Sequence, residues 1–529
     1  MTYRVLISDP LSEEGIFPLR EAADLEVIVD TGLEPAQLLE RIKGMDALIV
    51  RSQTQVTREV IEAADKLKII GRAGVGVDNI DLEAATEQGI IVVNAPDGNT
   101  NSAAEHTMAM LMSMARKIPQ AFHSLRNGNW DRKSYVGVEL KGKTLGVIGL
   151  GRIGAEVTAR AKGQRMEVIA YDPFLTEEKA DKMGVAFGTV EDVLRAADFI
   201  TVHTPLLPET RHLLDKEAFE LMKDGVQIIN CARGGIIDEQ ALYDAVVNKK
   251  VAGAALDVFE QEPMVDFRLL DLPEIIATPH LGASTVEAQE SVAIDVSRDV
   301  ISFLTEGIVR NSVNLPSVPK EAMAKIEPFF DLAERIGVFL TDLTGHTAQE
   351  VQIRYTGELA NSEVGPLTRN LIKGLLKRHL GRNVNVVNAL YLAEHREIRV
   401  QESKSTEMKA YTNLITAEVK TRAGTCKVSA TLLNGQGPRI VKVDDYLVDV
   451  VPKGHLLFIR HNDRPGVIGR VGTLLGTEDV NIATMQVGRS NEGGDAIMML
   501  SIDKGAGEES LERLRKLDEI VTVQAIDLE

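Results

Sequence analysis

Three residues suited to proton transfer and anion binding each follow an apolar, strand-like run. Arg233 comes after VQIIN, Glu262 comes shortly after GAALDVF, and His280 comes after IIATP. A histidine, with an unperturbed pKa of about 6.5, can take up a proton near neutral pH. A neighbouring carboxylate would favour its charged form, and an arginine can bind a carboxylate through two hydrogen bonds. Together these side chains could hold a small hydroxy acid and remove its hydroxyl proton.

Each of the three residues also has a structural interpretation. A single histidine after a strand is often a hydrogen-bonded loop residue, and Glu262 before Pro263 could be an ordinary turn residue. Arg233 could pair with Asp238 or Asp257. A shared site is favoured because a nucleotide-binding motif precedes all three.

That motif is GVIGLGRIG, which places Gly149, Gly151 and Gly154 in G-x-G-x-x-G spacing between a strand-like and a helix-like run. The first glycine permits the tight turn, the second lets the backbone approach a pyrophosphate, and the third lets helix pack on strand. The helix N-terminus favours the phosphates. Asp172, at the end of the next strand-like run, would bind the ribose hydroxyls and repel a 2′-phosphate, which predicts NAD rather than NADP.

A second glycine-rich segment, GRAGVGVDNI, lies upstream. It supplies Gly74 and Gly76 after a strand-like run, but Asn79 stands where a third glycine would be needed. We therefore predict an anion-binding turn here, in a different domain from the nucleotide site.

Short apolar runs alternate with helix-like patterns through the first half of the chain, which predicts parallel sheets with crossover helices. One set precedes residue 95 and another covers about 140–282, and helices near 102–117 and after 285 would connect them. Two Rossmann-like α/β domains would then flank a cleft, a preferred position for ligands. The predicted domains are 1–97 with 283–315 for substrate, 98–282 for the nucleotide, an α+β intervening domain over 316–452, and a βαββαβ ferredoxin-like domain over 453–529.

Composition sets limits on partners and location. The net charge of −19 disfavours nucleic acid and anionic membranes, so an anionic substrate would need local arginines. The chain has two cysteines, which predicts a reducing compartment. It has no run of about 20 apolar residues and begins without the pattern of a signal peptide. We expect a cytoplasmic protein.

The segments NCARGG, DVFEQEP and PHLGAST, with GLGRIG and HTPLLPET, resemble the D-isomer-specific 2-hydroxyacid dehydrogenases. RSQT, GRAGVGVDNID and the C-terminal extensions resemble the long branch of that family, over essentially the whole chain. The resemblance implies NAD-dependent oxidation of 3-phosphoglycerate (3-phospho-D-glycerate) to 3-phosphohydroxypyruvate, the first step of the phosphorylated route to L-serine. It also implies a homo-oligomer, either a dimer or a tetramer, and no metal site.

The resemblance also implies roles for individual residues. His280 would be the acid/base, Glu262 would tune it, and Arg233 would bind the substrate carboxylate and carbonyl. Arg51, Arg72 and Arg132, the last reaching in from a partner subunit, could instead be ordinary surface arginines. Substrate contacts are implied for Arg51, Ser52, Arg72, Gly74 and Arg132. Cofactor contacts are implied for Val75, Gly149, Gly151, Arg152, Ile153, Gly154, Asp172, Thr204, Pro205, Cys231, Ala232, Arg233, Asp257, His280 and Gly282.

The segment HLLFIRHNDRPGVIGRVGTLLGTEDVNIATM resembles an ACT domain, a module that binds amino acids at a paired interface. Its HNDRPG turn places polar groups beside a helix N-terminus, where a carboxylate is favoured. By resemblance, Asp463 and Asn481 would bind L-serine between two such domains, with His461 as a lesser candidate. Some relatives have Asn where this chain has Asp463, which leaves the ligand open, and a purely structural dimerisation module is the alternative.

Other functions fit parts of the pattern. Another dehydrogenase of the family would act on glycerate, hydroxypyruvate or a related acid. An NAD-sensing scaffold on the same fold is a rival from a different class. Production of 2-hydroxyglutarate is a compatible side activity. Arg51 and Arg72 in the first domain, together with the C-terminal extension, favour a phosphorylated substrate.

Overall fold

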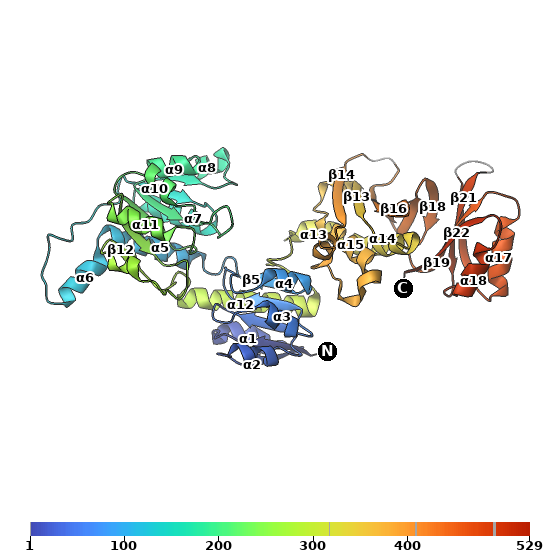
Figure 1. The fold of residues 1–529 in the computed structure, drawn as a ribbon, viewed down its shortest axis with the longest axis horizontal. Coiled ribbons are helices and arrows are strands. Elements are labelled where there is room, and N and C mark those ends of the chain that lie inside the picture. Colours follow the sequence, from blue (N-terminus) through green and yellow to red (C-terminus); the bar gives the residue numbers. More distant parts are fainter. Residues whose placement is uncertain (1, 317, 408–409, 490–493, 529) are drawn as a thin grey trace.

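The computed structural model describes residues 2–316, 318–407, 410–489 and 494–528, and their strands form four sheets (Figure 1). The first two sheets are entirely parallel, and their central strands are apolar runs that are largely buried on both faces, as is typical of parallel sheets. The third sheet is mixed and the fourth is antiparallel. The predicted fold class is confirmed: two Rossmann-like units are followed by two further α/β sandwiches.

The first sheet has the strand order β2-β1-β3-β4-β5. α12 (Val286–Glu306) follows the second sheet in sequence, yet its Val292 and Val296 belong to the core of the first sheet. Gly71 allows this approach, because a Cβ there would lie 2.5 Å from Val296. The chain therefore returns to its first sheet, as the sequence predicts. The other elements are β1 (Tyr3–Ile7), α1 (Glu13–Glu21), β2 (Leu25–Val29), α2 (Pro35–Arg41), β3 (Ala47–Val50), α3 (Arg58–Ala63), β4 (Ile69–Arg72), α4 (Leu82–Glu87) and β5 (Ile91–Asn94).

The second sheet has the order β12-β11-β10-β9-β6-β7-β8. The chain runs outward from β6 in one direction and then restarts at β9 on the other side, and ligands of such sheets bind at the carboxyl ends beside this switch point. α5 (Thr100–Ala115) connects the first sheet to the second and contributes to the core of the second. The remaining elements are α6 (Ile118–Arg126), β6 (Thr144–Ile148), α7 (Arg152–Gly163), β7 (Glu167–Tyr171), α8 (Glu177–Met183), β8 (Ala186–Phe187), α9 (Val190–Ala196), β9 (Phe199–Val202), α10 (Lys216–Leu221), β10 (Val226–Asn230), α11 (Glu239–Val247), β11 (Val251–Leu256), a 3₁₀ turn (Arg268–Asp271) and β12 (Ile275–Ala277).

The third sheet has the order β14-β13-β15-β16-β17-β18 and packs against a pair of helices, α14 and α15. The two helices approach closely because Gly337 and Gly374 face each other's backbone, where any Cβ would collide. The elements are α13 (Lys320–Ile326), α14 (Phe330–Thr344), β13 (Glu350–Gly357), α15 (Gly365–Leu380), α16 (Ala389–Glu394), β14 (Arg399–Ser405), β15 (Asn413–Thr421), β16 (Gly424–Leu433), β17 (Gly437–Val443) and β18 (Tyr446–Val450), with 3₁₀ turns at Glu327–Phe329, Glu358–Asn361 and Gly381–Asn383.

The fourth sheet, β20-β21-β19-β22, has the predicted βαββαβ order. Side chains of β19 alternate between its faces: Leu457 and Ile459 pack under α17 and α18, whereas Leu456 and Phe458 join the core of the third sheet. Arg335 on α14 reinforces this contact by donating to the carbonyl of Leu528 at 3.2 Å. The elements are β19 (Gly454–Asn462), α17 (Val467–Thr477), β20 (Ile482–Arg489), β21 (Asp495–Ile502), α18 (Glu508–Arg515) and β22 (Ile520–Leu528).

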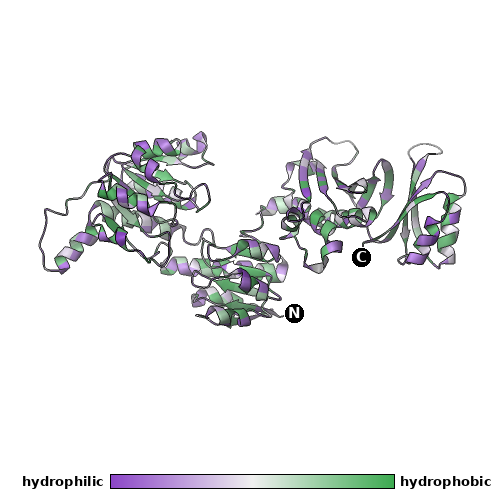
Figure 2. Cartoon of the chain, viewed as in Figure 1, coloured by the Kyte–Doolittle hydropathy of each residue, from purple (hydrophilic) through white to green (hydrophobic). Residues whose placement is uncertain are grey.

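The third sheet's unit also contacts the first. Asn385 donates to the carbonyl of Gly89 at 2.8 Å, Asn388 donates to that of Glu87 at 3.2 Å, and Val387 joins the first sheet's core. Figure 2 shows hydrophobic strands at the centre of each unit and more hydrophilic helices outside them. Among the described residues, no helix combines the length and apolarity needed to cross a bilayer.

Candidate active site

His280 and Glu262 form a hydrogen-bonded pair beyond the carboxyl end of the second sheet. The His280 Nδ1 and a Glu262 carboxylate oxygen lie 2.7 Å apart. The other Glu262 oxygen accepts the Phe259 N–H at 3.0 Å, which fixes the carboxylate. The hydrogen bond to Glu262 raises the pKa of His280 above its usual value, although partial burial opposes the shift. Burial alone would raise the pKa of Glu262, but the bonds from His280 and Phe259 lower it.

Arg233 lies where the two Rossmann-like units meet. Its Nη1 donates to the Ala232 carbonyl at 2.7 Å, and its Nε lies 3.2 Å from Asp78 of the first unit. Gly76, also from the first unit, makes room for the guanidinium, because a Cβ there would collide with it. The charge of Arg233 also opposes the rise in the pKa of His280, so the two side chains share one electrostatic environment.

The pairing of Arg233 with Asp238 or Asp257, considered from the sequence, is wrong. Asp238 instead caps α11 by accepting the Ala241 N–H at 2.9 Å. Asp257 is fully buried, and its carboxylate accepts hydrogen bonds from Thr278, Leu281 and Gly282 instead. The actual partner, Asp78, comes from the first unit, so proximity along the chain was misleading.

Two further arginines lie close to Arg233. Arg72 is largely buried, and burial together with the charges of Arg233 and Arg51 lowers its pKa to about 10. Its Nε has no hydrogen-bond partner, and Gly74, with a φ of 158°, leaves space for its guanidinium. Three mutually repelling cations, one of them buried without a partner at Nε, form a site prepared for an anion.

The loop that carries Arg51 and Ser52 is held by Asp9 and Asn79, neither of which was predicted to have this role. Asp9 accepts the Arg51 N–H at 2.6 Å and the Thr54 hydroxyl at 2.6 Å. Asn79 donates to the Arg51 carbonyl at 2.7 Å and to the Thr54 carbonyl at 2.6 Å. The only signal in the sequence was Asn79 in the position of the missing third glycine.

The nucleotide motif has the shape that a dinucleotide needs. Gly149 has a φ of 95°, and a Cβ there would lie 2.6 Å from the His203 carbonyl oxygen. A Cβ on Gly154 would collide with the Gly149 carbonyl, whereas the space beside Gly151 is open. Gly151 caps α7 without any side-chain hydrogen bond, so the first N–H groups of that helix remain available to phosphate.

Polar groups around this turn are also placed for the cofactor. Asp172 accepts the Leu150 N–H at 2.9 Å and the Phe174 N–H at 2.8 Å, which fixes its carboxylate beside the glycine turn. The Thr204 hydroxyl, which is buried, has no hydrogen-bond partner among the described residues and can bind a ligand group. These residues therefore fit NAD.

The other predicted cofactor residues lie in loops after strands of the two units or at the start of α7. Pro205 follows Thr204 after β9, and Val75 lies in the glycine turn of the first unit, where its carbonyl accepts from Asn94 at 2.5 Å. Arg152 and Ile153 open α7, and Arg152 pairs with Asp97. Cys231, Ala232 and Gly282 lie together near Asp257, and burial raises the pKa of the Cys231 thiol to about 12, which makes it unreactive.

Replacing Asp172 with alanine is expected to lower the ratio of kcat/KM for NAD to that for NADP by at least about tenfold, since each lost ribose hydrogen bond contributes about 1 kcal/mol. Removing the carboxylate also removes its repulsion of a 2′-phosphate. Initial rates with each cofactor measure the ratio. Asp181→Ala, an exposed change on α8, is the matched control, and an unchanged ratio in Asp172→Ala would contradict the assignment.

Arg132 lies apart from the other arginines, in the exposed segment between α6 and β6. Figure 1 shows α6 at the outer edge of the second unit, away from the first.

The proposed effector residues do not meet within one chain. His461 is buried, with its Nδ1 2.9 Å from the Asn462 carbonyl and its Nε2 without a partner. Asp463 lies 3.4 Å from Arg489, whereas Asn481 donates to Asp503 at 2.7 Å. Arg489 ends β20 and Asn481 precedes its start, so Asp463 and Asn481 lie at opposite ends of the sheet.

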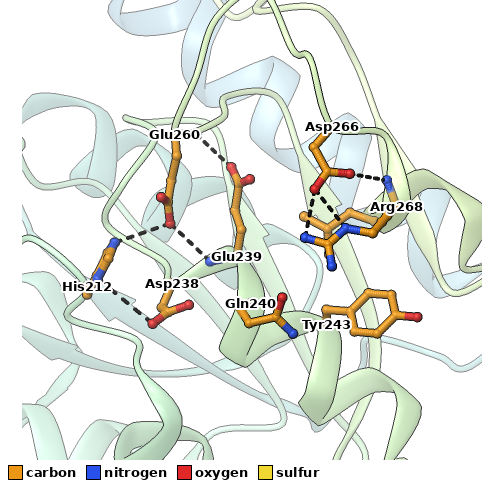
Figure 3. Close-up of a pocket in the computed structure, with 9 residues that line it drawn as sticks. His212, Asp238, Glu239, Gln240, Tyr243, Glu260, Asp266 and Arg268 are labelled. Atoms are coloured by element: carbon orange, nitrogen blue, oxygen red, sulfur yellow. Dashed lines mark hydrogen bonds and ion pairs between the residues drawn. The ribbon is translucent and has the colours of Figure 1, made fainter.

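A separate pocket of about 270 Å³ lies outside this constellation (Figure 3). His212 contacts Glu260 at 3.2 Å there, and Asp238, Glu239 and Asp266 make the lining mainly acidic. None of the lining residues is Arg233, Glu262 or His280. Because an acidic wall repels a carboxylate or a phosphate, the cluster of Arg51, Arg72 and Arg233 is the better candidate for binding an anionic substrate.

Comparison with known proteins agrees with this geometry. Residues 108–282 match the D-isomer specific 2-hydroxyacid dehydrogenase NAD binding domain, residues 325–444 the D-3-phosphoglycerate dehydrogenase intervening domain, and residues 455–519 the ACT domain. A D-lactate dehydrogenase from Aquifex aeolicus, solved with NAD and lactic acid, is 29% identical with a TM-score of 0.54, over 59% of this chain and 100% of its own. The chain belongs to the D-isomer specific 2-hydroxyacid dehydrogenase family.

Its full length matches a narrower group. D-3-phosphoglycerate dehydrogenase from Bacillus subtilis is 49% identical over 99% of this chain and 100% of its own length. The enzyme of the same name from Methanocaldococcus jannaschii is 47% identical over the same shares. Within the family, the chain therefore groups with the D-3-phosphoglycerate dehydrogenases that carry an intervening domain and an ACT domain.

Proposed function

We propose that this protein oxidises 3-phospho-D-glycerate at C2 with NAD, giving 3-phosphohydroxypyruvate and NADH. The observation that carries the proposal is the convergence of Arg51, Arg72 and Arg233 beside the His280–Glu262 pair. A substrate with both a carboxylate and a phosphate matches a site with three cations. The full-length relatives of the same name support it.

The geometry suggests how the chemistry proceeds. Arg233 binds the carboxylate and polarises the C2 oxygen, while Arg51 and Arg72 neutralise the phosphate. NAD, held by the glycine turn and Asp172, would supply the acceptor for the hydride that leaves C2. The Nδ1 of His280 is engaged by Glu262, so its Nε2 is the atom that takes the hydroxyl proton. Glu262 then stabilises the imidazolium that forms. The contacts from the arginines also hold the substrate in the position that the reaction requires.

The direct test is to mix the protein with NAD and 3-phosphoglycerate and to follow NADH absorbance. A rise is expected, and its absence with every 2-hydroxy acid on a panel would favour the NAD-sensing scaffold. Glycerate, assayed with NAD, and hydroxypyruvate, assayed with NADH, separate the other dehydrogenases. Reduction of 2-oxoglutarate, the compatible side activity, is followed as loss of NADH absorbance.

Replacing Arg51 with alanine is expected to reduce kcat/KM for 3-phosphoglycerate by about 10²-fold, because a charge-assisted hydrogen bond contributes about 1.5–3 kcal/mol. The loss for unphosphorylated glycerate should stay below about threefold, since that substrate lacks the anion that Arg51 would bind. Initial rates on both substrates measure the difference. Arg20→Ala, an exposed change on α1, is the control. Equal losses on both substrates would show that Arg51 does not bind the phosphate.

We further propose a homo-oligomer. The outer side of the second unit exposes a group of large apolar side chains, and monomeric proteins seldom expose such a patch. A second copy of the chain is the proposed occupant, and Arg132, which lies in the same segment, would then reach its neighbour's site. Sedimentation would distinguish a monomer from a dimer or tetramer. The exposed side chains are Ile118 (52%), Phe122 (63%), Leu125 (54%), Trp130 (81%) and Val136 (71%).

The C-terminal domain is the proposed site of regulation by L-serine. Because Asp463 and Asn481 lie at opposite ends of one sheet, a ligand that touches both must lie between two chains related by a two-fold axis. The matched ACT domain supports this placement. Calorimetry with L-serine tests it: heat together with inhibition is expected, and neither would appear if the domain only dimerises.

We propose a substrate domain over 1–97 and 283–315, a nucleotide domain over 98–282, an intervening domain over 316–452 and an ACT domain over 453–529. The return of α12 to the first sheet supports the discontinuous first domain. We also propose a cytoplasmic location, which the two free cysteines support.

A further inference from the structure

His280 adopts a backbone conformation that needs external support. Its φ is +56°, in the left-handed region that a non-glycine residue adopts at a cost of about 1 kcal/mol or more. Such a conformation persists only where surrounding contacts determine it. Asp257 and two residues of α5 provide these contacts for the turn 278–282.

Asp257 is the centre of that support. Its carboxylate accepts the Leu281 N–H at 2.7 Å, the Gly282 N–H at 2.8 Å and the Thr278 hydroxyl at 2.5 Å. Its backbone carbonyl accepts the His280 N–H at 2.9 Å. The Asp257 side chain is fully buried, and a buried carboxylate needs its hydrogen bonds to remain ionised.

Helix α5 contacts the same turn from the other side. The His106 Nε2 lies 3.2 Å from an Asp257 carboxylate oxygen and 3.1 Å from the Thr278 hydroxyl. Since the hydroxyl donates to Asp257 and an ionised carboxylate only accepts, Nε2 must carry a hydrogen. One turn earlier, the buried Ser102 donates to the Gly282 carbonyl at 2.8 Å. Ser102 and His106 are four residues apart and therefore share one helix face.

We propose that His106 and Ser102 are positioning residues: through Asp257 and Gly282 they hold the turn that carries the catalytic His280. The idea rests on the proposed function in one respect, namely that His280 is the proton acceptor. Neither residue is placed to touch the reacting atoms itself. Substrate binding depends on arginines from other elements. Loss of the contacts made by His106 and Ser102 should therefore affect the proton-transfer step more than substrate affinity.

The test compares two substitutions at one position. His106→Leu removes the donor at similar size, whereas His106→Gln offers an amide N–H at a similar reach. In the full-length protein, His106→Leu should lower kcat by about 10²-fold, the scale of a misplaced catalytic group, while KM for the hydroxy acid changes less than about threefold. His106→Gln should recover most of kcat. Glu105→Gln, with a side chain 68% exposed on the same helix, is the matched control.

A second readout does not depend on any substrate. Amide hydrogen exchange of Leu281 and Gly282 should be at least about tenfold faster in His106→Leu than in the wild type, and close to wild type in His106→Gln. If His106→Leu does not fold, Ser102→Ala removes the other anchor and should show a smaller change in the same direction.

The outcomes separate the two proposals. Unchanged exchange and kcat in His106→Leu would overturn the positioning role, as would a glutamine variant that is as impaired as the leucine variant. A wild-type protein that oxidises no 2-hydroxy acid would reject the proposed function, while hydrogen exchange would still decide how the turn is held.

Discussion

Replacing His280 with glutamine is expected to lower kcat by about 10³-fold, within the range that general acid–base catalysis contributes. Glutamine has a similar reach and can still hydrogen-bond to Glu262, but it does not take up a proton near neutral pH. Because Arg233, Arg51 and Arg72 remain, KM for the hydroxy acid should change little. Initial rates of NADH formation at saturating NAD measure both parameters.

The pH dependence of kcat/KM provides a second test of the role of His280. Proton removal requires neutral His280, and its hydrogen bond with Glu262 raises its pKa above the usual value. Below that pKa the imidazole is already protonated, so wild-type kcat/KM should fall as the pH drops through it. His280→Gln should lack this acidic limb.

The chain contains a matched control for this substitution. His212 also has a positive φ, of 50°, and its ring also lies 3.2 Å from a glutamate, Glu260. It lines the acidic pocket of Figure 3, which contains none of Arg51, Arg72 and Arg233. His212→Gln should therefore keep kcat within about twofold. Wild-type activity in His280→Gln would remove the proton-acceptor role.

Local sequence signals predicted the elements that position the site. The glycine spacing between a strand and a helix is a short-range pattern, so Gly149, Gly151 and Gly154 could be located from the amino-acid sequence alone. The carboxyl ends of neighbouring parallel strands meet at one edge, which is why Arg233 and His280 could be expected in one crevice.

What sequence could not supply were contacts between distant segments. Asp78 and Arg233 come from different sheets, and the candidates considered instead were simply nearer in sequence. His106 stands between glutamate and threonine in a helix whose pattern indicates core packing, so nothing local marks its hydrogen bond to Asp257. Conversely, Asp463 and Asn481 are close in sequence but separated by the length of a strand.

Replacing Arg233 with lysine is expected to lower kcat/KM by about 10²–10³-fold, the cost of losing a donor that acts on the transition state. Lysine keeps the charge, but its ammonium lacks the planar fork that binds a carboxylate through two bonds. Two contacts fix the orientation of the Arg233 guanidinium: Nε lies 3.2 Å from Asp78, and Nη1 donates to the Ala232 carbonyl at 2.7 Å.

A lysine has no equivalent of this double support, so its ammonium would be placed less accurately even though the net charge is unchanged. If Arg233 both binds the carboxylate and polarises the C2 oxygen, Arg233→Lys must raise KM and lower kcat together. A rise in KM alone would mean that it only binds the carboxylate, and an unchanged kcat/KM would exclude it from the site. Arg268→Lys, an exposed arginine paired with Asp266 in the acidic pocket, should leave both parameters within about twofold, since exposed ion pairs contribute little. The difference between the two substitutions therefore separates the contribution of guanidinium geometry from that of charge.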